Sequence, residues 1–253
     1  MSRGRLRVPL SPLAPGSLSL PEEAAAYVVR VHRLKVGDRF DVFDPARGVE
    51  AEAEIEELPR GGSPALRVRV GDVRAASVLP ARRVTLVQAL SKGEKMDAIV
   101  RDATELGATR VAPAIAERSV ARPDDVAGRA DRYRRIAAQA ARQCGRGDAP
   151  RIDVPAPLAS ILAEFAARSD VAGLVLDPSS QAPLRSQLLH LSPEAEVVFV
   201  VGPEGGLSGA ELNLCERSGL VRVSLGRFTL RTETVCAAVL GALLVLAAPD
   251  PAP

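Results

Sequence analysis

The stretch VVFVVGPEGGLS at residues 197–208 predicts a buried strand, a glycine turn and the start of a helix. It opens with an uninterrupted apolar run, which is typical of a strand that is buried on both faces of a parallel sheet. Glycines follow at once, and Ser208 and Glu211 have the spacing of a capping box at the start of a helix. A glycine turn in this place lies at the carboxyl end of a strand, where open α/β folds bind ligands.

The glycines of this turn have two readings. They let the backbone approach a ligand closely, yet any turn from a strand into a helix also favours glycine. The turn lacks the Gly-Lys-Ser or Gly-Lys-Thr of a nucleotide P-loop and the Gly-x-Gly-x-x-Gly spacing of a dinucleotide site. A phosphate cradle is therefore the less favoured use of this loop.

A second loop, SLGRFTLRTET at residues 224–234, also joins the end of a strand to a helix. Two loops in such places can face each other across one pocket. Arg231 and Glu233 bracket Thr232 just ahead of the helix, so both are candidates for chemistry. The alternative is an N-terminal cap with a local ion pair.

Residues 81–253 predict an α/β domain in which apolar strands alternate with helices around a mostly parallel sheet. Ser91 and Glu94 have the spacing of a capping box and predict a helix that ends at Gly107. The apolar face of that helix consists of Met96, Ile99, Ala103 and Leu106. The segment 234–247 is almost wholly apolar and predicts a helix buried in the core or against a second subunit. The expected strands are residues 84–90, 111–115, 173–176, 197–201 and 221–225.

Residues 1–72 predict a small β-barrel-like domain, and residues 73–80 a linker. Apolar and acidic residues alternate over 49–56, and apolar residues alternate with arginines over 66–70, as in strands with one buried face. We expect a turn at 60–64 between them, and glutamates paired with arginines across the two strands. A further short strand is expected at 39–43.

The composition fits a globular enzyme-sized chain of 253 residues, of which 47% are hydrophobic. The three cysteines and two histidines are scattered, so we expect neither a disulfide framework nor a metal site, and a reducing cytoplasm as the location. No segment has the length of a membrane span. The net charge of +2 does not by itself indicate a polyanion partner.

The segment 131–146 predicts a helix with an apolar stripe and a basic face. The stripe consists of Tyr133, Ile136, Ala137, Ala140 and Cys144, and the other face of Arg135, Gln139, Arg142 and Arg146. This face is a candidate for RNA phosphates, with a solvated charged surface as the alternative. Lys92 and Lys95, beside the carboxyl end of the first strand of the second domain, are weaker candidates.

Several motifs in the right order resemble a known family. Residues 201–207 together with 225–234 look like the signature of the knotted SPOUT methyltransferases. The segments 91–96, 104–108, 117–120 and 139–146 are similar to the RsmE family within that class, and RLKVGD at 33–38 continues the likeness. The resemblance extends over about residues 28–246.

The resemblance implies a trefoil-knotted SPOUT domain that dimerises, a PUA-like N-terminal domain, and methylation of N3 of a uridine in 16S ribosomal RNA. It implies S-adenosyl-L-methionine as cofactor, bound by Leu176, Gly202, Pro203, Glu204, Gly205, Gly206, Leu225, Gly226, Leu230, Arg231 and Thr232. It implies RNA contacts from Arg5, Arg7, Arg33, Lys92, Lys95, Arg118, Arg135, Arg142 and Arg146. The family often has paired histidines where Ala26 and Tyr27 stand and an aromatic pair at Leu6 and Arg7, so these RNA contacts differ in detail.

Methylation at uridine N3 requires loss of the N3 proton, because the protonated nitrogen is a weak nucleophile. Arg231, and Arg7 from the first domain, are the expected groups to stabilise the resulting anion. Glu233 is the expected proton acceptor, with solvent as the alternative. Two other functions stay open: a catalytically silent RNA-binding protein, and a methyltransferase of a ribose 2′-hydroxyl.

Overall fold

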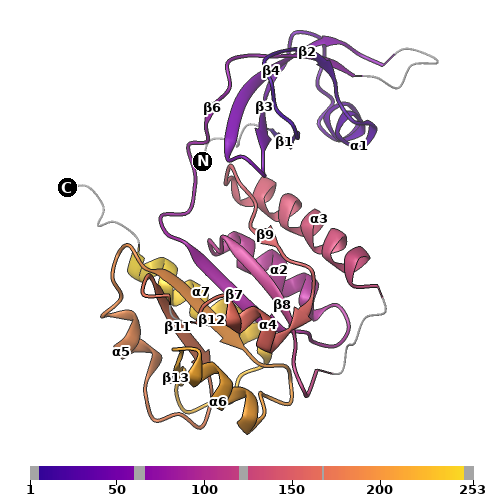
Figure 1. Ribbon diagram of the computed structural model, residues 1–253. Helices are drawn as coiled ribbons and strands as arrows, with labels where there is room; N and C mark the ends of the chain where they lie inside the picture. The colour runs from indigo at the N-terminus through magenta and orange to yellow at the C-terminus, as the bar shows by residue number, and fades with distance from the viewer. Residues whose placement is uncertain (1–5, 60–65, 120–124, 167, 248–253) are drawn as a thin grey trace. The chain divides into compact units, whose positions relative to one another are not determined.

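The computed structural model describes residues 6–59, 66–119, 125–166 and 168–247 (Figure 1). The chain forms two compact units. The first consists of residues Met1–Leu79 and Ala141–Ala149, and the second of Pro80–Ala140 and Pro150–Pro253. The segment expected to be a linker, 73–80, thus groups largely with the first unit.

The first unit is built on a sheet with the strand order β1-β3-β4-β5-β2, with β6 beside β4. The strands are β1 (Arg7–Pro9), β2 (Gly16–Ser19), β3 (Arg39–Asp44), β4 (Val49–Glu57), β5 (Arg67–Val70) and β6 (Arg74–Ala75). β1 runs parallel to β3, and the other pairs are antiparallel. The three expected strands are confirmed, and the expected turn at 60–64 lies outside the described residues.

The alternating pattern of β4 and β5 places apolar residues in the core and charges on the surface, as predicted. Ala53, Ile55 and Val68 are buried. Glu54 lies opposite Arg69, and Arg69 forms an ion pair with Glu56 at 2.7 Å. The expected pairing of glutamates with arginines is confirmed; exposed pairs of this kind contribute little to stability.

Two short helices that the sequence did not predict follow β2. These are α1 (Glu22–Ala26) and the π-helix η1 (Tyr27–Val31), which bury Ala25 and Val28 in the core of the first unit. Their few apolar residues span too short a stretch to show a helical period. η1 ends just before Arg33, which has a left-handed backbone with φ of 55°.

The second unit is built on a parallel sheet with the order β10-β8-β7-β12-β11-β13, with β9 beside β8. The strands are β7 (Val84–Ala89), β8 (Arg110–Ile115), β9 (Arg151–Ile152), β10 (Ala156–Pro157), β11 (Val171–Leu176), β12 (Glu196–Val201) and β13 (Val221–Val223). The expected parallel sheet is confirmed. β13 ends before the expected residue 225, because the chain turns at Gly226, whose φ of 136° favours glycine.

Helices cover both faces of this sheet (Figure 1). α2 and α7 pack together on one face, and α4 and α6 on the other. The helices are α2 (Lys95–Glu105), α3 (Val126–Cys144), α4 (Leu158–Ala163), α5 (Leu184–Leu188), α6 (Gly209–Arg217) and α7 (Thr232–Ala247). Among the described residues no helix is long and apolar enough to cross a membrane.

One of the two predicted capping boxes is correct. Ser208 accepts from the backbone of Glu211, whose carboxylate accepts from the backbone of Ser208. The prediction at Ser91 is wrong: the Ser91 hydroxyl donates to the carbonyl of Ala89, and α2 begins only after Glu94, which makes no side-chain cap. A turn at residues 93–94 separates Ser91 from the start of α2, so Ser91 does not cap this helix.

The basic helix begins earlier and ends earlier than predicted. α3 buries Tyr133, Ala137 and Ala140 as expected, but Cys144 is exposed. The last turn of α3, from Ala141, groups with the first unit. Because α3 ends at Cys144, Arg146 lies in the following loop, where it is 4% exposed and paired with Asp148 at 2.9 Å. Arg146 is therefore not a surface cation on the exposed face of α3, where the sequence placed it as a contact for RNA.

The apolar helix α7 is buried along one side only. Cys236, Val239, Leu240 and Leu243 are buried. Near its end, Leu244, Val245 and Leu246 are 48%, 75% and 50% exposed. One side of α7 therefore packs in the core, and its last turn exposes three apolar side chains together.

Candidate active site

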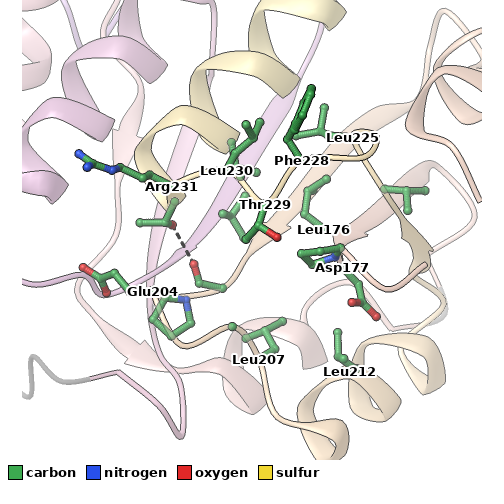
Figure 2. Close-up of a pocket in the computed structure, with 18 of the residues that line it drawn as sticks. Leu176, Asp177, Glu204, Leu207, Leu212, Leu225, Phe228, Thr229, Leu230 and Arg231 are labelled. Carbon is green, nitrogen blue, oxygen red and sulfur yellow. Dashed lines mark hydrogen bonds between the residues drawn. The ribbon is translucent and has the colours of Figure 1, made fainter. Parts of the chain in front are cut away.

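A cavity of about 690 Å³ lies at the carboxyl ends of three neighbouring strands, β11, β12 and β13 (Figure 2). Its walls are the loop after β11, the glycine turn after β12 and the long loop between β13 and α7. The two loops singled out from the sequence therefore face one pocket. The pocket has the size of a small-molecule site, roughly 300–1,000 Å³.

Every residue expected to bind the cofactor lines this cavity, except Gly205. The carbonyl of Gly205 instead accepts a hydrogen bond of 2.9 Å from Arg118 Nη1. Gly202 has a structural reason to be glycine, since a Cβ there would lie 3.0 Å from the backbone nitrogen of Leu207. The two readings of the glycine turn are thus compatible: the tight turn forms a wall of the cavity.

The wall of the cavity is largely apolar, with few charges. Its large apolar side chains are Leu176, Val201, Leu207, Leu212, Val223, Leu225, Phe228, Leu230 and Val235. The charged ones are Lys95, Asp177, Glu204 and Arg231. Figure 2 shows Glu204 and Arg231 on one side of the cavity and Leu176 and Asp177 on the other.

Glu204 is held at the rim by the first residue of α2 and by the loop before it. Lys95 Nζ donates to Glu204 Oε1 at 2.8 Å, and the backbone nitrogen of Lys92 donates to the same oxygen at 3.3 Å. Burial alone raises the pKa of Glu204, but these hydrogen bonds outweigh burial and hold the pKa below its usual value. Lys95, expected to contact RNA, therefore forms part of the cavity.

Thr232 connects the two main loops. Its hydroxyl donates to the carbonyl of Gly202 at 2.8 Å. It also accepts a hydrogen bond of 2.9 Å from Nε2 of Gln88, at the carboxyl end of β7. The glycine turn and the start of α7 are thus joined through side chains that are almost fully buried.

The three catalytic candidates lie in different surroundings. Arg231 is exposed and lines the cavity. Glu233 does not line it, and its Oε2 is buried with no hydrogen-bond partner among the described residues. Arg7 belongs to the first unit, where its guanidinium pairs with Glu50 at 3.3 Å and lies over the ring of Phe43.

The candidates for RNA contact are spread over both units. Arg33, Lys92 and Arg135 are exposed. Arg142 is half-buried, with its guanidinium carbon 4.1 Å from the ring centroid of Tyr27. Arg118 is exposed and bonded to the glycine turn as described above. Arg5 lies outside the described residues.

Comparison with known proteins identifies the family. Residues 78–244, which include every wall of the cavity, match a family described as an RNA methyltransferase domain. The chain belongs to this family. Residues 20–62 of this methyltransferase also match an RNA methyltransferase PUA domain.

Relatives of this methyltransferase carry one name. The ribosomal RNA small subunit methyltransferase E of a Synechocystis strain is 32% identical over 243 residues, which cover 95% of this chain and 78% of the relative. The enzyme of that name from Mycobacterium bovis is 35% identical over 246 residues, which cover 90% of this chain and 89% of the relative.

Solved structures share the fold. The methyltransferase E of Neisseria gonorrhoeae, bound to S-adenosyl methionine, has a TM-score of 0.83 and 26% identity, covering 96% of this chain and 98% of that chain. A Legionella pneumophila protein with bound SAM has a TM-score of 0.83 and 29% identity, with the same coverage. These matches confirm the expected PUA domain and α/β domain, and the trefoil knot stays a prediction.

Two residues of the methyltransferase site were missed in the sequence. Asp177 is buried and lines the cavity directly after β11, and its Oδ1 accepts from both the backbone and the hydroxyl of Ser179. Gln88 is the last residue but one of β7. Both are polar residues at the carboxyl end of a buried strand, a signal that the sequence offered. In the described part of the chain, no cluster of metal-ligating side chains forms.

Proposed function

We propose that this chain transfers a methyl group from S-adenosyl-L-methionine to N3 of a uridine in 16S ribosomal RNA. The observation that carries the proposal is the cavity, in which the two signature loops of the family meet. The names of the relatives support a small-subunit ribosomal RNA as substrate. The uridine base as target rests on the resemblance of residues 91–108 and 139–146 to the RsmE family.

The residues of the cavity fit the cofactor in chemistry and size. When bound, S-adenosyl-L-methionine supplies a methyl group on a positively charged sulfur. The leucines on the walls suit the apolar parts of an adenosyl group, and the carboxylates of Asp177 and Glu204 suit the positive sulfonium and amino groups. A solved relative from Neisseria gonorrhoeae binds the same molecule.

Arg231 is the proposed group that makes the uridine reactive. It is exposed and lines the cavity on the same side as Glu204 (Figure 2). A guanidinium there stabilises the negative charge that remains after N3 loses its proton, which lowers the barrier to methyl transfer. Glu233 was the expected proton acceptor, but it does not line the cavity. We therefore assign the proton to solvent, and Glu233 to the first turn of α7, where a carboxylate favours the helix dipole.

The first unit is proposed to hold the RNA by its phosphates. Arg39, Arg69 and Arg74 on its sheet are paired with glutamates. In contrast, Arg33 and Lys35 are exposed and form no ion pair within the described residues. Unpaired cations of this kind supply the salt-dependent part of RNA binding.

We also propose a homodimer formed through the second unit. The exposed side chains of Leu244, Val245 and Leu246 at the end of α7 are apolar and adjacent, which a second copy would bury. Because the proposed substrate is ribosomal RNA, we also propose the cytoplasm as the location.

Transfer of a labelled methyl group tests the proposal directly. The purified chain is incubated with methyl-labelled S-adenosyl-L-methionine and with 16S ribosomal RNA or small subunits that lack the modification, and the nucleosides are then separated. Label in 3-methyluridine supports the proposal. Label in a ribose-methylated nucleoside indicates the other SPOUT activity, and no label despite cofactor and RNA binding indicates a silent RNA-binding protein.

A further inference from the structure

Gln88 is a buried amide at the end of an otherwise apolar strand segment. It follows Leu86 and Val87 on β7, is 0% exposed, and lies opposite Val201 in the sheet, one residue before Gly202. A polar side chain in such a place is stable only if its hydrogen-bonding groups have partners. The two ends of the amide differ in this respect.

The nitrogen of the Gln88 amide is fully used. Nε2 donates to the hydroxyl of Thr232 at 2.9 Å and to the carbonyl of Ala89 at 3.0 Å. Nε2 also lies 3.5 Å from the carbonyl oxygen of Gly202. An amide nitrogen has two hydrogens, so both are engaged by these contacts.

The oxygen of the same amide is not used. Oε1 of Gln88 is buried and has no hydrogen-bond partner within the described part of the structure. A buried carbonyl without a partner costs free energy that an apolar side chain of similar size would not. Packing and stability therefore do not explain a glutamine at this position. The hydrogen bonds that its amide nitrogen donates explain it.

The donated hydrogen bond fixes the direction of the Thr232 hydroxyl. A hydroxyl has one hydrogen, and because Gln88 occupies an acceptor position, that hydrogen points to the carbonyl of Gly202, 2.8 Å away. Thr232 begins α7, and Gly202 begins the glycine turn. The two hydrogen bonds thus join the ends of two neighbouring strands, β7 and β12, to the start of α7.

We infer that Gln88 is a positioning residue of the methyl-donor site, which acts through Thr232 to hold the glycine turn and the loop before α7 at the separation that the cofactor requires. The inference rests on the proposed function, because it takes S-adenosyl-L-methionine as the ligand. Gln88 itself does not line the cavity.

The test compares cofactor affinity with stability in the full chain. Gln88→Met has a similar volume and removes the donors together with the unpaired carbonyl. We expect its dissociation constant for S-adenosyl-L-methionine, measured by calorimetry, to rise by about tenfold, the effect of losing one hydrogen bond. Its midpoint of urea unfolding is expected to equal or exceed that of the parent chain. A residue with a merely structural role would instead lower the midpoint.

Variants of Thr232 provide a second test of the same connection. Thr232→Val removes only the hydroxyl and is expected to weaken cofactor binding as much as Gln88→Met, while Thr232→Ser restores it. The double variant is expected to be no weaker than either single one, because both changes break the same connection. Thr85→Val is the control: it removes a buried hydroxyl bonded to Glu196 at the opposite end of β7, and should lower stability without changing cofactor affinity.

The outcomes separate the inference from the function. A parent chain that binds no S-adenosyl-L-methionine overturns the proposed function. A parent chain that binds it, with Gln88→Met and Thr232→Val binding equally well, overturns the positioning role and leaves the function in place. Additive losses in the double variant also contradict a shared connection.

Discussion

Lys95 Nζ lies 2.8 Å from Glu204 Oε1, so a lysine at the start of α2 holds a carboxylate of the glycine turn. The two residues are 109 positions apart in the chain. They come together because β7 and β12 are neighbours in the sheet, so that the loops after both strands emerge at the same edge. Lys95 therefore acts on the glycine turn, and its side chain is already engaged with Glu204.

Replacement of Lys95 should weaken cofactor binding. Lys95→Met leaves the Glu204 carboxylate without its cation, so we expect the dissociation constant for S-adenosyl-L-methionine to rise by about threefold to tenfold, as for one partly exposed charged hydrogen bond. Lys92→Met is the matched control, because Lys92 contacts Glu204 through its backbone nitrogen. Equal losses in both variants would show that the Lys95 side chain has no special role.

The same pair predicts the response of the site to acid. Hydrogen bonds from Lys95 lower the pKa of Glu204 from its ordinary 4.5, although burial opposes them. The stabilisation that the Lys95–Glu204 pair gives to the site is therefore complete above the ordinary pKa of Glu204. It is lost as the pH falls through the lowered pKa. Cofactor affinity measured against pH should begin to fall at a higher pH in Lys95→Met than in the parent chain. Coincident curves would contradict this assignment.

Arg231 and Glu233 should differ in their effect on methyl transfer, although they are two residues apart. Arg231→Ala is expected to lower the turnover number by about a hundredfold or more, because it removes the cation that stabilises the uridine anion. Glu233→Gln is expected to keep most of the activity, because Glu233 lies outside the cavity lining. Single-turnover rates with saturating cofactor check both. A large loss in Glu233→Gln would restore it as the proton acceptor.

RNA binding should depend on the unpaired cations of the first unit. We expect Arg33→Ala to weaken RNA binding and to reduce the slope of log affinity against log salt by about 0.7–0.9, the share of one phosphate contact. Arg39→Ala is the control, because Arg39 is already paired with Glu52 and Glu54. Filter binding over a range of salt concentrations measures both slopes, and equal slopes in Arg33→Ala and the parent chain would argue against phosphate contact.

The apolar end of α7 should govern the assembly state. Val245→Asp places a charge in the exposed apolar group and is expected to shift the protein from dimer to monomer. Arg217→Asp on α6 changes an exposed residue elsewhere and should leave the mass unchanged. Sedimentation equilibrium distinguishes the two, and a monomeric parent chain would remove the homodimer from the proposal.

The fold was predictable where the pattern of apolar residues was long. β12, a continuous apolar run, and β4, a strict alternation, both form as expected. Short elements such as η1 and α5 were missed, because a single turn shows no period. The capping box predicted at Ser91 was wrong for a different reason. The spacing of Ser91 and Glu94 fits a capping box, but in the structure the Ser91 hydroxyl donates to the carbonyl of Ala89.

The site was predictable in its loops but not in its connections. The cavity is lined by residues of both signature loops, including Gly202 of the first and Thr232 of the second. The roles of Gln88 and Lys95 depend on which strands are neighbours in the sheet, which the order along the chain does not reveal. The burial of Arg146 beside Asp148 was not predictable either, because it depends on where α3 ends.

The decisive experiment is mass spectrometry of 16S ribosomal RNA from a strain that lacks this protein. We expect one uridine to lose a methyl group from its base, and the gene for the parent chain to restore it while the gene for Arg231→Ala does not. An unchanged methylation pattern, or the loss of a ribose methyl group in place of a base methyl group, would show that the chain does not methylate uridine N3.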